Sequence, residues 1–117
     1  ALGPDQRLYV GELGSLVPGQ GRVSVWELDG THVKDINGLS QITSIAVDKD
    51  GNIYVTELFL GKLLKLDPNG NTLAEADLPL PGGVAVDDRG NVYVSVFSIF
   101  PGFGPFPGTG MVWRGSL

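Results

Sequence analysis

Apolar and polar residues alternate through most of the chain, in short runs separated by Gly, Pro, Asn and Asp. In the run NIYVTEL, residues 52–58, the alternation places Ile53 and Val55 on one face of a strand. Tyr54 and Thr56 fall on the other face. No segment shows the 3.6-residue periodicity of an amphipathic helix. The pattern therefore predicts an all-β protein built from short strands.

The alternating runs recur at a nearly constant interval. The segment IAVDKDGNIYVTEL begins at Ile45 and VAVDDRGNVYVSVF begins at Val84, so that Tyr93 lies thirty-nine residues after Tyr54. The N-terminal segment ALGPDQRLYVGEL matches the same pattern, with Tyr9 forty-five residues before Tyr54. A period near forty residues that carries short strands is typical of β-propeller blades.

The middle repeat, residues 39–79, contains a complete four-stranded antiparallel blade. Asp-Gly and Asn-Gly turns separate its strands, which we place at 42–48, 52–58, 62–67 and 72–78. Residues 1–38 keep only the tail of an innermost strand, and residues 80–117 stop before an outermost strand. We therefore expect one propeller segment of about three blades, of which two are partial.

Three blades cannot close a ring, and an open set exposes unpaired strand edges. One interpretation is a piece of a longer propeller, whose remaining blades complete the ring. The other is a protomer that forms a homodimer, because two copies supply six Tyr-Val strands. Each junction of that dimer would lack one outer and one inner strand, which favours the first interpretation.

The segment NGLSQITSIAVDKDGNIYVTEL resembles the ScyD/ScyE family of bacterial propeller proteins, which is placed among the NHL-like and gluconolactonase-like six-bladed propellers. ALGPDQRLYVGEL and FPGTGMVWRGS are similar to other stretches of that family. The resemblance implies a six-bladed ring when complete, an extracellular or periplasmic location, and no firmly assigned reaction. Gluconolactonase-like relatives are metal-dependent hydrolases, so the resemblance also makes a lactonase or esterase the alternative function.

Candidate metal ligands are expected on the face of the blade that carries the links between blades. Glu12 and Glu57 each end the second strand of their blade, and Asn37 is expected in a blade-to-blade link. Two carboxylates and an amide could bind Ca²⁺ or another divalent cation through oxygen, and such a cation could polarise an ester carbonyl. The competing interpretation is that each Glu accepts hydrogen bonds from loop amides. We favour it because the residue recurs with the repeat.

The segment FSIFPGFGPFPGTG, residues 97–110, carries no charge and is an insertion between two strands of the last repeat. Its end, FPGTG, matches VPGQG in the first repeat, which suggests a shared turn. Such an apolar insertion exceeds what a soluble surface normally exposes. We therefore expect a non-catalytic module that binds a partner or self-associates through this loop. The predicted contact residues are Phe97, Ile99, Phe100, Phe103 and Phe106.

Composition removes several other functions from consideration. The formal charge is −5 and the eight basic residues are scattered, which argues against a nucleic-acid partner. No apolar run has the length of a membrane span, and residues 1–7 lack the features of a signal peptide. The chain has no Cys and a single His, so it offers no thiol nucleophile and no His-rich zinc site.

Overall fold

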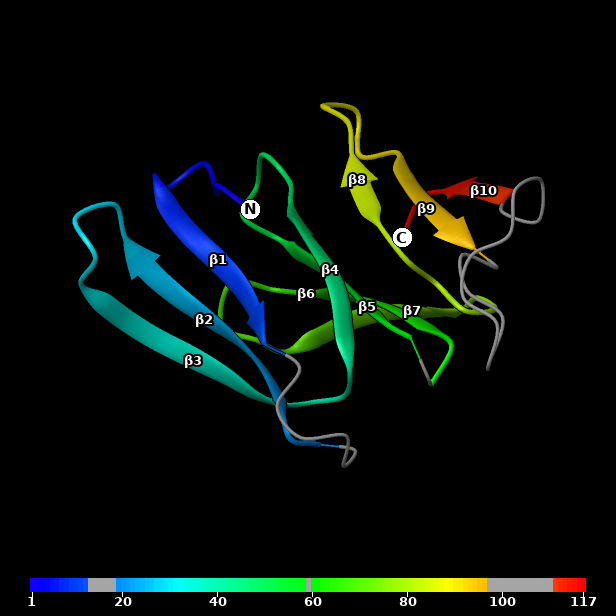
Figure 1. Ribbon diagram of the computed structural model, residues 1–117. Helices are drawn as coiled ribbons and strands as arrows, with labels where there is room; N and C mark the ends of the chain where they lie inside the picture. Colours follow the sequence, from blue (N-terminus) through cyan, green and yellow to red (C-terminus); the bar gives the residue numbers. More distant parts are fainter. Residues whose placement is uncertain (13–18, 59, 97–110) are drawn as a thin grey trace.

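Three antiparallel β-sheets lie side by side in sequence order in the computed structural model (Figure 1). The structure describes residues 1–12, 19–58, 60–96 and 111–117. The first sheet contains β1 (Arg7–Glu12), β2 (Gly21–Glu27) and β3 (His32–Leu39). The second contains β4 (Ile42–Val47), β5 (Ile53–Glu57), β6 (Lys62–Leu66) and β7 (Thr72–Asp77). The third contains β8 (Val84–Val86), β9 (Val92–Val96) and β10 (Met111–Gly115).

The second sheet is the complete unit that the repeat predicts. Its strands pair in the order β4-β5-β6-β7, each antiparallel to the next. Tyr54 pairs with Ala46 on one side and with Lys65 on the other. The alternating runs therefore identified all four strands to within a residue or two of their observed ends.

The first and third sheets are incomplete in the expected places. In the first sheet, the innermost strand is represented by a single bridge between Leu2 and Leu8. The amide of Tyr9 donates to the oxygen of Ala1 over 2.8 Å, which fixes this short edge. The third sheet has the order β10-β9-β8, so among the described residues no strand lies outside β10.

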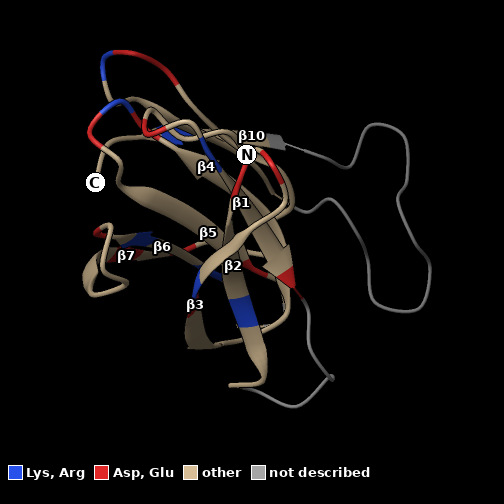
Figure 2. Ribbon diagram, turned by 90° about the vertical axis from the view of Figure 1, so that its left-hand side faces the viewer, with Lys and Arg blue, Asp and Glu red and all other residues tan. Residues whose placement is uncertain are grey.

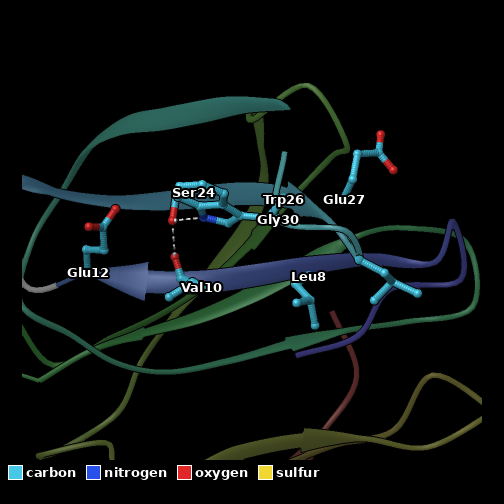
Figure 3. Close-up of a pocket in the computed structure, with 8 residues that line it drawn as sticks. Leu8, Val10, Glu12, Ser24, Trp26, Glu27 and Gly30 are labelled. Atoms are coloured by element: carbon cyan, nitrogen blue, oxygen red, sulfur yellow. Dashed lines mark hydrogen bonds between the residues drawn. The ribbon is translucent and has the colours of Figure 1, made fainter. Parts of the chain in front are cut away.

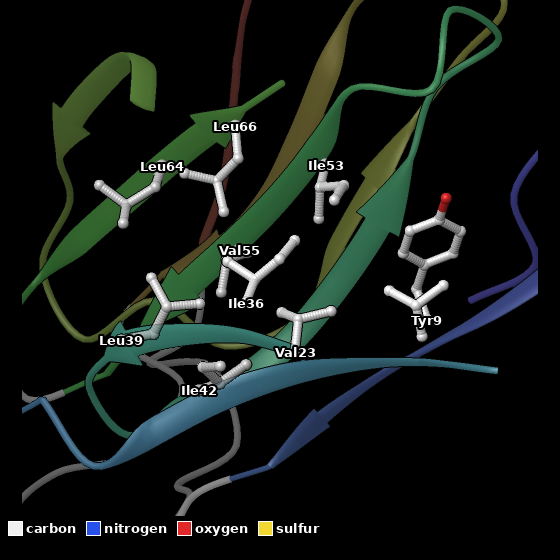
Figure 4. Packing of buried hydrophobic residues seen from close by; sticks show 10 residues of the cluster. Tyr9, Val23, Ile36, Leu39, Ile42, Ile53, Val55, Leu64 and Leu66 are labelled. Atoms are coloured by element: carbon white, nitrogen blue, oxygen red, sulfur yellow. The ribbon is translucent and has the colours of Figure 1, made fainter. Parts of the chain in front are cut away.

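Apolar side chains fill both spaces between neighbouring sheets. Ile53 and Val55 pack with Val23 and Val25 of the first sheet (Figure 4). Tyr54 points the opposite way, into a second cluster that includes residues of the third sheet. The predicted alternation of β5 is thus confirmed, and both of its faces are buried. The full membership of the first cluster is Tyr9, Val23, Val25, Ile36, Leu39, Ile42, Ile53, Val55, Leu64 and Leu66.

In the second sheet, the side chain of Asp48 forms a hydrogen-bonded turn at the surface and also binds a tyrosine of the core. The Oδ1 atom of Asp48 accepts the amides of Asp50 and Asn52, each over 2.9 Å. Its Oδ2 atom accepts the phenolic hydroxyl of Tyr54 over 3.1 Å. Gly51 allows the turn because its φ of 85° is one that other residues rarely adopt.

A hydrogen bond from the repeated Tyr to an Asp is also present in the other two sheets, although Asp5 lies four residues before Tyr9, whereas Asp48 and Asp87 lie six residues before their Tyr. Asp87 accepts the hydroxyl of Tyr93 over 3.3 Å, and Asp5 accepts that of Tyr9 over 2.6 Å. Burial and the Asp48 carboxylate together raise the pKa of Tyr54 to about 12, so that the hydroxyl stays protonated and donates at neutral pH. The repeated Asp therefore has a structural role in the second and third sheets, and Asp5 has a similar role in the first.

We expect the Asp48→Ala variant to lose about 3 kcal/mol of unfolding free energy, because two amides and a buried hydroxyl lose their acceptor. The Asp50→Ala variant is the control, since it removes the same charge from an exposed position in the same turn. Urea unfolding followed by far-UV circular dichroism measures both. Equal stability of the two variants would contradict a structural role for the Asp48 carboxylate.

Candidate functional site

Glu12 lies at the end of β1 with its carboxylate at the surface. Its Oε2 atom accepts a hydrogen bond from Nε of Arg22 over 2.7 Å. The Arg22 guanidinium holds the pKa of Glu12 below its usual value. The carboxylate therefore pairs across the strands of its own sheet, and the loop that follows it, residues 13–18, is outside the described residues.

Glu57 occupies the equivalent position at the end of β5, where it is 5% exposed. Its Oε2 atom accepts the amide hydrogen of Ser40 over 2.6 Å. Ser40 lies in the link between β3 and β4, so this carboxylate fixes the entry into the second sheet. Burial raises the pKa of Glu57 despite that hydrogen bond. Here the expected bond between Glu and a loop amide is present.

Asn37 lies within β3, two residues before its end, where we expected it in the following link. Its side chain is exposed, and Gly38 follows it with a φ of 83°. In residues 1–12, 19–58, 60–96 and 111–117, no three His, Cys, Asp or Glu side chains are grouped so that they could hold a metal ion. The third equivalent position is Val96, which has no ligand atom in its side chain.

The predicted contact residues of the last repeat are outside the described residues. They are Phe97, Ile99, Phe100, Phe103 and Phe106, all within 97–110.

A depression in the described surface lies on the outer face of the first sheet (Figure 3). Its volume is about 380 Å³. Trp26 forms part of its wall and donates from Nε1 to Oγ of Ser24 over 2.9 Å, which fixes the indole (Figure 3). The lining residues are Leu8, Val10, Glu12, Ser24, Trp26, Glu27, Leu28 and Gly30.

Comparison between repeats explains why this face is apolar. Leu8 is equivalent to Ile53 and Val92, because each directly precedes the repeated Tyr. Ile53 and Val92 are both 0% exposed, since each packs against the preceding sheet, whereas Leu8 is 39% exposed.

Val10 shows the same contrast. It is 45% exposed, and its equivalents Val55 and Val94 are 0% exposed. This face of the first sheet therefore has the composition of a buried interface, and no described sheet lies beside it.

The third sheet has a matching open face on its other side. Val112 of the third sheet is equivalent to Leu63 of the second, because Val112 pairs with Ser95 as Leu63 pairs with Thr56. Leu63 is 0% exposed and Val112 is 71% exposed. Tyr93, which is equivalent to the buried Tyr54, is half-buried on this side.

These two open faces are the part of the candidate site that our sequence interpretation missed. The signal was present in the alternation of Leu8 and Val10, which matches that of a strand with two buried faces. Unpaired strand edges were predicted, and the apolar faces beside them were not.

Basic and acidic residues are interspersed along the described strands and turns (Figure 2). Arg7 pairs with Glu27, Arg22 with Glu12, and Lys62 with Asp77. The described residues therefore present no basic patch of the kind that phosphate backbones require. No helix in this part of the chain is long and apolar enough to cross a membrane.

Known proteins support the blade interpretation. A family model described as SBBP, beta-propeller repeat, matches residues 35–56. The β-propeller domain of Cps50 (Swd1) from Myceliophteria thermophila has 15% identity and a TM-score of 0.62, with 92% of this chain and 35% of that domain covered. The chain has a β-propeller fold. Each of its sheets is accordingly one blade, complete or partial.

Two further solved structures show the same fold. A protein of unknown function from Bacteroides caccae has 17% identity and a TM-score of 0.63, with 97% of this chain and 43% of that protein covered. Virginiamycin B lyase from Staphylococcus aureus has 16% identity and a TM-score of 0.59, with coverages of 96% and 38%. The chain thus spans less than half the length of these propellers. No curated protein sequence matches it, and membership of the ScyD/ScyE family stays a prediction.

The two equivalent glutamates should affect stability with opposite dependence on pH. For Glu57, whose folded pKa is raised, the favourable contribution is present below the ordinary value of 4.5 and is lost as pH rises through the folded pKa. For Glu12, whose folded pKa is lowered, the contribution is present above 4.5 and is lost as pH falls through the folded pKa.

Urea unfolding of the wild type, Glu57→Gln and Glu12→Gln between pH 3 and 7 measures this difference. Relative to Glu57→Gln, the wild type should lose stability as pH rises above 4.5; relative to Glu12→Gln, it should gain stability as pH rises toward 4.5. If the stability of the wild type changed with pH in the same direction relative to both variants, the opposite pKa shifts of Glu12 and Glu57 would be contradicted.

Proposed function

We propose that this chain is a non-catalytic propeller module that supplies three blades to a six-bladed ring and joins the other blades through its two open faces. The observation that carries the proposal is the exposure of Leu8 and Val10, at positions that are fully buried in the other two blades. Burying such side chains is favourable by roughly 1.5–3 kcal/mol each. A face of this composition is therefore stabilised when another blade covers it.

The remaining blades have two possible sources. They belong either to a second copy of the chain or to the rest of a longer chain, since related folds are more than twice as long. Both arrangements use the same two faces. We also propose the extracellular or periplasmic location that the resemblance implies.

The loop formed by residues 97–110 has a separate role in this proposal. In the sequence it connects β9, which ends at Val96, to β10, which begins at Met111. Loops on a rigid scaffold commonly carry binding residues. We propose that its Phe side chains contact a partner, while the blade faces hold the ring together.

Replacing Leu8 and Val10 together by Ser should weaken association about a hundredfold, because two apolar side chains lose their burial. The Leu73→Ser variant is the control, since Leu73 is 54% exposed on β7, away from both open faces. Sedimentation velocity over a range of concentrations gives the association constant, and far-UV circular dichroism confirms the fold.

A Phe103→Ser, Phe106→Ser double variant separates the loop from the faces. It should keep the association of the wild type if the faces hold the ring. A Leu8 and Val10 variant that associates as the wild type does would contradict the proposal. A wild type that stays monomeric at every concentration would exclude a second copy as the source of the other blades and leave the rest of a longer chain.

A metal-assisted lactonase or esterase is the second candidate. The observation in its favour is that β1 and β5, which end in Glu12 and Glu57, end at the same edge of adjacent blades (Figure 1). Titration with Ca²⁺ by calorimetry tests it. Heat of binding with a rise in Tm would support it, because a ligand of the folded state stabilises that state; absence of both would remove this candidate.

A further inference from the structure

Both junctions between blades contain the same polar contact. Nζ of Lys34, in the first blade, donates to the main-chain oxygen of Pro68 in the second over 2.6 Å. Nζ of Lys65, in the second blade, donates to the main-chain oxygen of Leu117 in the third over 2.9 Å. In each junction a cation of the preceding blade therefore binds an oxygen of the following blade.

The two acceptors occupy equivalent positions. Pro68 lies two residues after Leu66, which pairs with Ile53, and Leu117 lies two residues after Gly115, which pairs with Val92. By the same count, the equivalent residue of the first blade is Leu28, two residues after Trp26, which pairs with Leu8.

Leu28 stands at the rim of the apolar depression, beside Glu27. Within the described ranges no Lys or Arg side chain donates to its main-chain oxygen, and no described blade lies on that side. The first blade thus has the main-chain oxygen that would accept a hydrogen bond in a junction, next to the carboxylate of Glu27.

The third blade presents the donor half. Arg114 pairs with Tyr93 as Lys65 pairs with Tyr54. The two cations also lie over the two rings at nearly the same distance, 5.7 Å for Arg114 and 5.8 Å for Lys65. Arg114 is therefore placed like the lysine that crosses the second junction, on a face that no described blade covers.

We propose that the open face of the first blade binds the open face of the third blade of a second copy, head to tail. Arg114 of one copy then donates to the oxygen of Leu28 in the other, beside Glu27, while Val112 and Tyr93 cover Leu8 and Val10. Two such contacts close a ring of two chains. This inference rests on the proposed function, because it assigns an occupant to the same two faces.

The four strands β1, β2, β9 and β10 form each contact. The chain supplies no strand outside β10 in the described residues, and only the bridge at Leu2 represents the innermost strand of the first blade. Each contact joins two different surfaces, and the two-fold symmetry of the pair generates it twice, which closes the ring. A contact between two first-blade faces would be isologous and would leave Arg114 unused.

Two face variants distinguish these arrangements. Leu8→Asp disables the first-blade face and Val112→Asp disables the third-blade face. In the head-to-tail ring each contact joins a first-blade face to a third-blade face. A sample of one variant alone therefore has a disabled face in every contact, and each variant should be monomeric. An equimolar mixture has one intact contact per pair, so it should recover a two-chain species at a higher concentration than the wild type needs. Sedimentation velocity measures the mass, and circular dichroism confirms that each variant folds.

Arg114→Gln tests the polar contact itself. It should weaken dimerisation about tenfold, because a charge-assisted hydrogen bond is lost. Arg89→Gln removes the same charge from the turn before β9 and should leave dimerisation unchanged. Equal effects of the two substitutions would overturn the assignment of Arg114.

The outcomes separate this inference from the proposed function. A folded mixture that stays monomeric, or dimerisation of Val112→Asp alone, would overturn the head-to-tail arrangement while association of the wild type still supports the open faces. A wild type that is monomeric at all concentrations would overturn the head-to-tail ring and leave the rest of a longer chain as the occupant of the open faces. Recovery in the mixture, together with loss in each variant alone, is the result that we expect.

Discussion

The structure depends on one constraint. Each blade carries apolar side chains on both faces, and each face is stabilised when a neighbouring blade covers it. Hydrophobic burial is the dominant favourable term in folding and is proportional to the area removed from water. The second blade satisfies the constraint completely, because Ile53 and Tyr54, adjacent in sequence, lie in different cores. The first and third blades satisfy it on one face only. The open faces at Leu8 and Val112 follow from this difference, and so does the proposal that the chain joins further blades.

Polar contacts orient the core side chains and neighbouring blades, which apolar burial alone does not do. The turn at Asp48 binds both its own amides and the hydroxyl of Tyr54, so the orientation of a core ring is set by a surface turn. Lys34 and Lys65 then set how one blade meets the next. Such charge-assisted bonds are directional, whereas apolar burial is not. The recurrence of both contacts explains how short sheets with different sequences adopt the same arrangement.

The repeat is a weaker guide to function than to fold. Glu12 and Glu57 occupy equivalent positions, yet one pairs with Arg22 at the surface and the other binds the Ser40 amide in a buried link. Their pKa values shift in opposite directions, because the Arg22 guanidinium lowers the pKa of Glu12 and burial raises that of Glu57. A residue that recurs with a repeat therefore acquires its chemistry from neighbours that do not recur. The proposed metal site depends on such neighbours, and the match to other propellers establishes only their shared fold.

The sequence by itself determined the strands, the turns and their order, because alternation and Asp-Gly or Asn-Gly turns are local signals with a fixed geometric meaning. It also placed the missing strands at the two ends of the chain. The environment of each repeated residue was decided only by the tertiary structure, since burial depends on which sheet lies alongside. Nothing local distinguishes Leu8 from Ile53, or Glu12 from Glu57. The difference arises because a blade precedes the second repeat and no described blade precedes the first.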